Sequence, residues 1–415
     1  MFHFLISFIY YIFNVLVLFG FLFEIPISGS FTSRRASCLV AVIVLVLNRR
    51  KLYALMHNLI IKRLQKAICL LLICLFLVLI SSSFVYFQDN NSSYLQPWYF
   101  VNLFLYVIVF SFFTVTRFKD AKEFLLIYVT CFLIQTAVVY YAVINTAFRL
   151  LIFNLFYSGD DRFERYVENG TRIMGIALHS STGSIICSTS IVLLTYCYLK
   201  KHIQSILYFT LSILFISMTM FIGRTGLLVE ILCFVYAVIS GKNKNRAIKL
   251  FFASFAVLIS IYIVLNLISV TDSGGGNYLM EWICSAFTSK GHQDTMDAIV
   301  RKLPPLSYEF IFGTSVMNGR TPDGIRFDTD SGYIMMYASL GIIGSLFYYL
   351  AHYNLYLITN VKKSAKVIYH FFLLIILISF VIEYKEPFMF KYIFSYIIMV
   401  VTLFEDKELL MTGLK

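Results

Sequence analysis

The sequence predicts an all-α membrane protein with about twelve transmembrane helices, and three observations support this fold class. Hydrophobic residues make up 60% of the 415 residues and charged residues only 13%, which gives a mean hydropathy of +0.81. This composition lies far from that of a soluble globular protein. The apolar residues form runs close to the roughly 20 residues that a membrane-spanning helix needs. The alternating pattern of a membrane β-barrel is absent, so the spans are expected to be helices.

The predicted spans follow one another along the chain. Those of the first half are 2–23, 36–47, 67–87, 98–116, 124–148 and 184–199. Those of the second half are 203–222, 226–240, 248–270, 333–357, 367–382 and 387–404. The run 36–47 is short, but the small polar residues before it, such as Ser33, extend it. We expect residues 1–415 to form one integral membrane domain.

The charge distribution predicts which side of the membrane each connection faces. The connections 48–66, 117–123, 200–202, 241–249, 359–366 and 405–415 hold 20 of the 34 Lys and Arg residues but only five acidic residues. Basic connections are retained in the cytoplasm, so both termini are expected there. The large external loops are then 149–183 and 271–331. The net charge of +12 reflects this topology and does not indicate nucleic-acid binding.

The longer external loop, 271–331, has an organisation of its own. Gly274, Gly275 and Gly276 interrupt regular structure at its start. Apolar residues then recur with helical spacing from Asp294 until Pro304 and Pro305 end that helix. A segment rich in turn residues follows. We expect residues 294–331 to form a partly helical cap over the bundle.

The sequence contains no pattern for a metal ion, a disulfide framework or a cofactor. Seven of the eight cysteines lie within predicted spans, and Cys284 lies in the loop 271–331. The seven histidines are scattered and form no His-x-x-x-His pair. We therefore expect neither a metal site nor a cofactor.

Arginines on the predicted external side are candidate anion ligands, because membrane topology disfavours basic residues there. Guanidinium groups stay charged and match phosphate oxygens bidentately. The glycines beside Arg224 would let a phosphate approach the N-terminus of the next helix. Lipid-headgroup contact or a surface salt bridge is the alternative for any single arginine. The set that predicts a site for a lipid-linked pyrophosphate is Arg172, Arg224, Arg301, Arg320 and Arg326.

Carboxylates in the same loop are candidates for general-base catalysis. Glu309, Asp323, Asp328 and Asp330 precede the span 333–357. One of them could take the proton from a sugar hydroxyl as it attacks an activated anomeric carbon. Asp330 is the first choice because it lies nearest the membrane, and a helix N-cap is its alternative role. Glu230 lies inside a predicted span, which indicates a role in packing or function.

These residues resemble the motifs of O-antigen polymerases (Wzy-like) and O-antigen ligases. The segment Gly223-Arg224-Thr225-Gly226-Leu227-Leu228 resembles their Arg-Gly-Leu-type motif. Ile311-Phe312-Gly313-Thr314-Ser315 resembles their Leu-Phe-Gly-x-Gly, with Ser315 in place of the second glycine. Asp330-Ser331-Gly332-Tyr333, followed by Leu340-Gly341-Ile342-Ile343-Gly344, is similar to their loop exit and span entry. Ten residues separate Arg172 from Gly183, which is similar to a spacing in polymerase loops, whereas Arg301 and Gly313 do not have this spacing.

The resemblance implies a metal-independent glycosyltransferase of GT-C-like architecture in the bacterial cytoplasmic (inner) membrane. It would join undecaprenyl-diphosphate-linked oligosaccharides, as donor and acceptor, into an O-antigen or capsule at the external face. Arg172 and Arg224 would hold the pyrophosphate, the loop arginines would orient the donor, and a loop carboxylate would assist the acceptor. Besides these glycans and the membrane lipids, a chain-length regulator and a flippase are candidate partners.

Two alternatives remain open. An O-antigen ligase would transfer the polymer to a lipid A-core acceptor, but ligases typically carry a histidine where this chain has Asp330. A polysaccharide-unit flippase or other transporter would also have many spans and a basic cytoplasmic face. Transporters generally keep ionisable residues along a path at mid-bilayer, whereas this chain places almost no charge in its spans.

Overall fold

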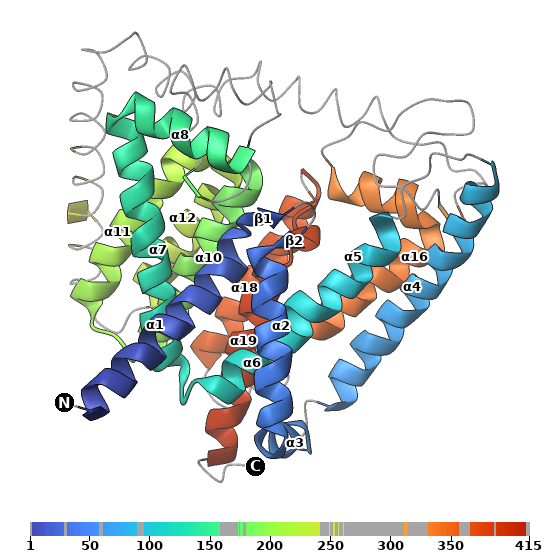
Figure 1. The fold of residues 1–415 in the computed structure, drawn as a ribbon, viewed down its shortest axis with the longest axis horizontal. Helices are drawn as coiled ribbons and strands as arrows, with labels where there is room; N and C mark the ends of the chain where they lie inside the picture. The colour runs from blue at the N-terminus through green and yellow to red at the C-terminus, as the bar shows by residue number, and fades with distance from the viewer. Residues whose placement is uncertain are drawn as a thin grey trace. The chain divides into compact units, whose positions relative to one another are not determined.

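Figure 1 shows the computed structural model of the chain. The described residues are 2–28, 31–57, 61–88, 95–157, 173, 175–176, 180–240, 249, 252–253, 256, 260, 311–313, 331–356, 366–385 and 387–411. They are almost entirely helical, which confirms the all-α prediction. Among them, seven helices are long and apolar enough to cross a membrane, so the chain is a polytopic membrane protein.

The chain forms two compact units. Unit 1 comprises Met1–Val44, Arg117–Ala286 and Ala365–Phe371, and unit 2 comprises Leu45–Thr116, Phe287–Ser364 and Phe372–Lys415. The expectation that residues 1–415 form one integral membrane domain stays a prediction.

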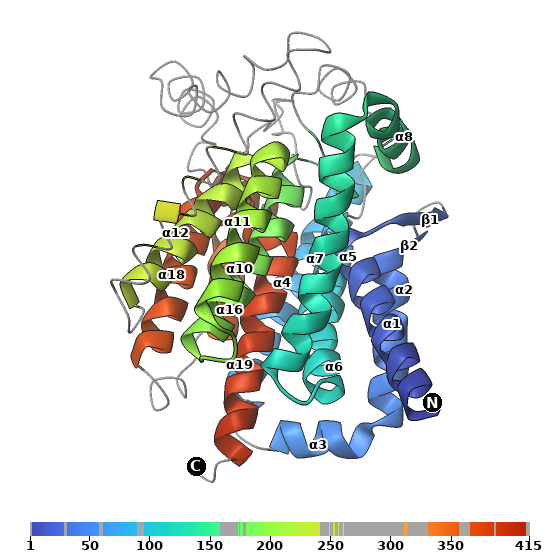
Figure 2. The same cartoon turned by 90° about the vertical axis from the view of Figure 1, so that its left-hand side faces the viewer.

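Unit 1 is built around a helix that is unusually rich in hydroxyl groups. Helix α10 (Ser180–Leu199) packs against α7, α11 and α12, and it runs among them in Figure 2. The buried hydroxyls of Ser188 and Ser190 donate to carbonyl oxygens one turn earlier, and the Thr189 hydroxyl pairs with that of Tyr128. These bonds satisfy polar groups that would otherwise be costly to bury. The other elements of this unit are α1 (Phe2–Phe23), β1 (Pro26–Ser28), β2 (Phe31–Thr32), most of α2 (Ser33–Leu47), α7 (Ala121–Ile144), α8 (Thr146–Tyr157), α11 (Ser205–Ile222) and α12 (Arg224–Ser240).

Unit 2 has a long helix pair at its centre. Helix α16 (Gly332–Tyr356) packs along α4 (Ile61–Gln88), and α19 (Ile393–Met411) packs against α16 and the π-helix η1 (Phe104–Val109). A buried hydroxyl pair, Tyr99 with Tyr348 at 2.7 Å, also joins α5 (Leu95–Leu103) to α16. The other elements of this unit are α3 (Arg49–His57), α6 (Phe110–Arg117), most of α18 (Lys366–Glu383) and η3 (Met389–Lys391).

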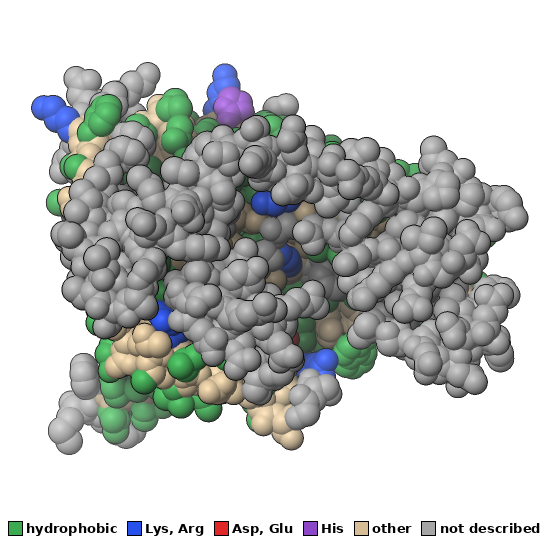
Figure 3. Space-filling view, turned by 90° about the horizontal axis from the view of Figure 1, so that it is seen from above, with side chains coloured by type: hydrophobic (Ala, Val, Ile, Leu, Met, Phe, Trp, Pro, Cys, Tyr) green, Lys and Arg blue, Asp and Glu red, His purple; other side chains and the backbone are tan. Residues whose placement is uncertain are grey.

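Large hydrophobic side chains remain exposed on the helices, as a protein surrounded by lipid requires. Leu16 is 65% exposed, Ile239 66% and Leu377 62%. In the view of Figure 3, hydrophobic and basic side chains show at several places among the described residues, whereas acidic ones barely show. A soluble protein would rarely expose so much apolar surface.

The structure corrects several predicted span boundaries. The predicted run 124–148 ends early, because Asn145 leaves helical geometry and its side chain caps α8 by accepting from the Phe148 N–H at 2.9 Å. The last predicted span, 387–404, begins as a helix only at Ile393, after the short helix η3. The predicted span 248–270 and the predicted cap 294–331 lie largely outside the described residues.

Candidate functional site

Most of the predicted site residues lie outside the described part of the chain. These are Arg172, Arg301, Arg320, Arg326, Glu309, Asp328 and Asp330. Arg224 is described as the first residue of α12, but its side chain is not described. The described residues next to these positions still show how the backbone around them is built.

In unit 1 the chain directly after Arg172 is bonded to the chain just before Arg224. The Ile173 N–H donates to the Phe221 carbonyl at 3.1 Å. Phe221 lies in the last turn of α11, and Gly223 follows in an extended conformation before α12 begins. The structure therefore places two segments that are about fifty residues apart in sequence at the same end of α11 and α12.

The segment 173–176 is also attached to α7. Gly175 has a left-handed backbone with φ of +57°, and a Cβ at this position would overlap the Gln135 side chain. The Ile176 N–H donates to the Gln135 Oε1 atom at 3.0 Å, and Gln135 is fully buried. A buried amide that accepts from the backbone holds this segment firmly against α7. Contacts with two helices thus fix the backbone next to Arg172.

The structure gives Gly226 a different role from the one that its sequence suggested. Its N–H donates to the Ser184 hydroxyl at 3.2 Å, and a Cβ on Gly226 would overlap the Ser184 carbonyl of α10. Glycine is therefore required here because α10 and α12 approach each other closely, and this N–H already has a partner. The N-terminus of α12 still carries the positive end of the helix dipole.

Glu230 lies further along α12 and connects this helix to α11. Its Oε1 atom accepts a hydrogen bond from the Thr219 hydroxyl at 2.7 Å, and the residue is fully buried. Its second oxygen, Oε2, has no hydrogen-bond partner among the described residues. Since Glu230 follows Arg224 by six positions, the two residues lie on different faces of α12.

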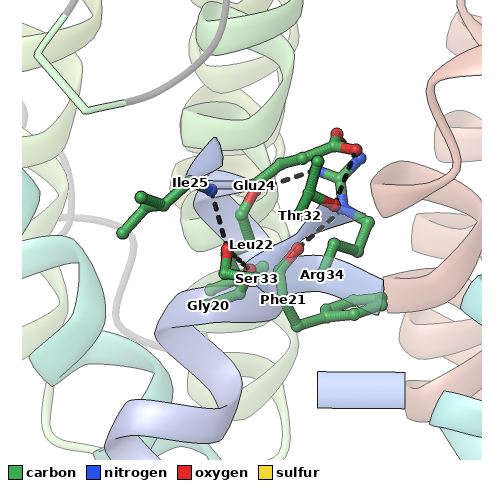
Figure 4. Close-up of polar contacts among 8 residues, drawn as sticks. All are labelled: Gly20, Phe21, Leu22, Glu24, Ile25, Thr32, Ser33 and Arg34. Atoms are coloured by element: carbon green, nitrogen blue, oxygen red, sulfur yellow. Dashed lines mark hydrogen bonds and ion pairs between the residues drawn. The ribbon is translucent and has the colours of Figure 1, made fainter. Parts of the chain in front are cut away.

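Arg34, which is not one of the predicted site residues, has a well-described set of contacts (Figure 4). Arg34, at the start of α2, donates from Nε to the Phe21 carbonyl at 2.8 Å and from Nη2 to the Leu22 carbonyl at 3.1 Å. It also forms an ion pair with Glu24. These contacts satisfy carbonyl groups at the C-terminal end of α1, which lack partners within that helix. Arg34 therefore has a structural role.

In unit 2 two glycine-containing motifs of the predicted site meet directly. Gly341 interrupts α16 with φ of +67°, so the predicted span 333–357 is a kinked helix rather than a continuous one. Gly313 also has a left-handed backbone, with φ of +73°, and a Cβ on it would overlap the Gly341 backbone. The Ile343 N–H donates to the Ile311 carbonyl at 3.5 Å. The segment 311–313 thus packs onto the kink of α16.

Sequence reasoning missed Glu383, a buried carboxylate at the end of α18. It accepts hydrogen bonds from the Met389 N–H at 2.8 Å and from the Tyr349 hydroxyl at 3.2 Å. A Cβ on Gly332 would overlap its carboxylate. The signal in the sequence was an acidic residue that directly follows the apolar run 367–382 and precedes Pro387.

The described residues include no group of three or more His, Cys, Asp or Glu side chains that could hold a metal ion. In comparisons with known proteins, no family model, no curated protein and no solved structure matches this chain.

Proposed function

We propose that this chain is an oligosaccharide repeat-unit polymerase with twelve spans and a GT-C-like architecture. It would extend a surface polysaccharide at the external face of a bacterial cytoplasmic membrane, from undecaprenyl-diphosphate-linked donor and acceptor. The observation that carries the proposal is the hydrogen bond between Ile173 and Phe221, because it brings together the segments bearing Arg172 and Arg224.

Two neighbouring guanidinium groups suit a pyrophosphate better than one. A diphosphate leaving group gains negative charge as its bond to the sugar breaks, and groups that neutralise this charge lower the barrier. Arg172 and Arg224 would supply two positive charges next to the electropositive start of α12. Burial of the adjacent backbone against α7 and α10 would keep these charges in place.

The contact between Gly313 and Gly341 adds support from a second motif pair. Both glycines belong to segments that resemble polymerase and ligase motifs, and both have backbone angles that other residues adopt only with strain. Their contact gives a physical reason for glycine at these two motif positions. It supports the resemblance without depending on the arginines.

The proposed reaction is a displacement at the anomeric carbon of the donor. The acceptor hydroxyl oxygen forms the new bond to that carbon, and the bond from the carbon to the diphosphate oxygen breaks. Undecaprenyl diphosphate leaves with the bonding electron pair, stabilised by Arg172 and Arg224. The hydroxyl proton passes to a carboxylate, for which Asp330 is the first choice and Asp328 and Glu309 are the others. Arg301, Arg320 and Arg326 would orient the donor.

Purified protein in liposomes with lipid-linked repeat units tests the proposal. A ladder of longer lipid-linked glycans is the expected product. Transfer to a lipid A-core acceptor without a ladder would instead support the ligase. Movement of repeat units across the bilayer without glycan transfer would support the flippase and overturn the proposal.

A further inference from the structure

The carboxylate of Glu383 lies in a setting where a charged group is costly. The residue is fully buried at the end of α18, and Lys391 of η3 is near enough to interact with it electrostatically. It accepts from the Met389 N–H at 2.8 Å and from the Tyr349 hydroxyl at 3.2 Å. A buried carboxylate persists only when such partners compensate for lost hydration. Glu383 therefore joins α18 to α16 and to the turn that precedes α19.

The first residue of α16 packs directly against this carboxylate. A Cβ built on Gly332 would overlap the Glu383 carboxylate and would lie 2.7 Å from the Pro387 Cα atom. No larger residue fits between α16 and the turn without displacing one of them. The start of α16 is thus fixed by Glu383 on one side and by Pro387 on the other.

A tyrosine pair strengthens the same junction. The Tyr333 hydroxyl donates to the Phe380 carbonyl of α18 at 2.8 Å. The rings of Tyr333 and Tyr349 lie with centroids 5.1 Å apart, within the range of favourable aromatic contacts. Both hydroxyl groups donate hydrogen bonds to protein acceptors. The cluster of Gly332, Tyr333, Tyr349 and Glu383 therefore suits a supporting role better than direct binding of a substrate.

We propose that Glu383 is a positioning residue for glycan transfer, an inference that rests on the proposed function. It packs against Gly332, the first residue of α16, and Asp330 lies two positions earlier in the sequence. A general base must be held at hydrogen-bonding distance from the acceptor hydroxyl, and a shift of a fraction of an ångström slows the proton transfer. Loss of the Glu383 carboxylate is expected to slow the transfer while leaving donor binding unchanged.

The first experiment measures the position of α16 without using activity. Ser331, which is 1% exposed, is replaced by cysteine (Ser331→Cys) in a full-length Cys284→Ser background. A membrane-impermeant thiol reagent then modifies the introduced thiol, and the rate of modification is measured. Glu383→Ala should raise this rate about tenfold, because local packing protects the thiol at position 331. Glu383→Gln should stay near the parental rate, because an amide oxygen still accepts from the Met389 N–H. Glu405→Ala, at another buried carboxylate, in α19, is the matched control for Glu383→Ala and should not change the rate.

The second experiment measures elongation by the same variants in liposomes. Glu383→Ala should lower kcat about a hundredfold with little change in the KM for the donor, as expected for a small misplacement of a reacting group. In an Asp330→Asn background, Glu383→Ala should lower kcat only a little further, because both changes act on the same step.

The two experiments separate the possible failures. If Glu383→Ala leaves both the thiol modification at position 331 and kcat at parental values, the inference is overturned. A lower melting temperature with unchanged kcat per folded molecule would also overturn it, since Glu383 would then only stabilise the fold. If the thiol at position 331 responds as expected but the parent protein elongates no glycan, the proposed function fails and the role of Glu383 in transfer fails with it.

Discussion

The Ile173 N–H donates to the Phe221 carbonyl oxygen at 3.1 Å, and this bond joins the segment that follows Arg172 to the helix that ends just before Arg224. Gly175, which has a left-handed backbone, packs against Gln135 of α7. The described residues that follow Arg172 are therefore held by backbone hydrogen bonds to α11 and α7. Such support is what a site for a charged leaving group needs, because loosely held charges stabilise a transition state poorly.

Arg224→Ala should abolish chain extension while the protein still inserts in the membrane and folds. Loss of one charged contact to a leaving group typically costs about a hundredfold to a thousandfold in rate. Arg224→Lys should recover part of this loss, because lysine keeps the charge but lacks the bidentate fork. Glycan ladders and melting temperature would be measured together. Full-length polymer from Arg224→Ala would remove this residue from the site.

Arg34→Ala should lower the stability of the protein rather than its activity. It removes hydrogen bonds to the Phe21 and Leu22 carbonyls and leaves Glu24 without its ion-pair partner. The expected loss of stability is roughly 3 kcal/mol, with activity per folded molecule retained. Additional replacement of Glu24 by alanine should return part of that stability, since the unpaired carboxylate is then gone. A change in kcat at unchanged stability would contradict this structural role.

Gly226→Ala should destabilise unit 1 strongly. Its Cβ would overlap the Ser184 backbone, which cannot move as a side chain can, so we expect a loss of about 3 kcal/mol or more. Gly20→Ala in α1 is the matched control, because its Cβ would lie 3.1 Å from the Ser37 Oγ atom and 3.2 Å from the Ser33 Cβ atom. Thermal unfolding of both variants in detergent makes the comparison. Equal melting temperatures would mean that α10 and α12 do not pack this closely.

Glu230→Gln should leave both stability and elongation near parental values. A glutamine oxygen still accepts from the Thr219 hydroxyl, so the connection between α11 and α12 persists. Glu230→Ala should lower the melting temperature, because it removes that bond and leaves a cavity. The transporter alternative predicts that Glu230→Gln abolishes movement of repeat units across liposomes. Parental polymer ladders from Glu230→Gln would favour the polymerase.

The helices could largely be predicted from the sequence because apolar runs of membrane length have few other structures open to them. Predicted span 2–23 coincides with α1, and 203–222 nearly coincides with α11. The kink at Gly341 could not be predicted, since hydropathy does not report backbone angles. The break at Asn145 was missed because apolar residues continue on both sides of it.

The candidate site could be predicted only as a set of residue types. Arg172 and Arg224 were identified because basic residues are disfavoured on the predicted external side. The hydrogen bond between Ile173 and Phe221 could not be predicted, because it depends on a fold that no local pattern encodes. Glu383 was missed for the same reason. Its partners Tyr349 and Gly332 lie more than thirty residues earlier in the chain, and only the packing of α16 against α18 and the following turn brings them to it.

Asp330→Asn should lower kcat about a hundredfold or more with little change in the KM for the donor, because an amide cannot accept the hydroxyl proton. Ser331 rather than Asp330 holds the N-cap position of α16, because the helix begins at Gly332 and the Met335 N–H donates to the Ser331 carbonyl. Asp330→Asn should therefore keep its melting temperature. Asp330→Ala is the matched comparison, since it also removes the base and should lower kcat as much without a loss of stability. Steady-state elongation and thermal unfolding of the two variants make the comparison, and parental turnover in both would shift the general base to Asp328 or Glu309.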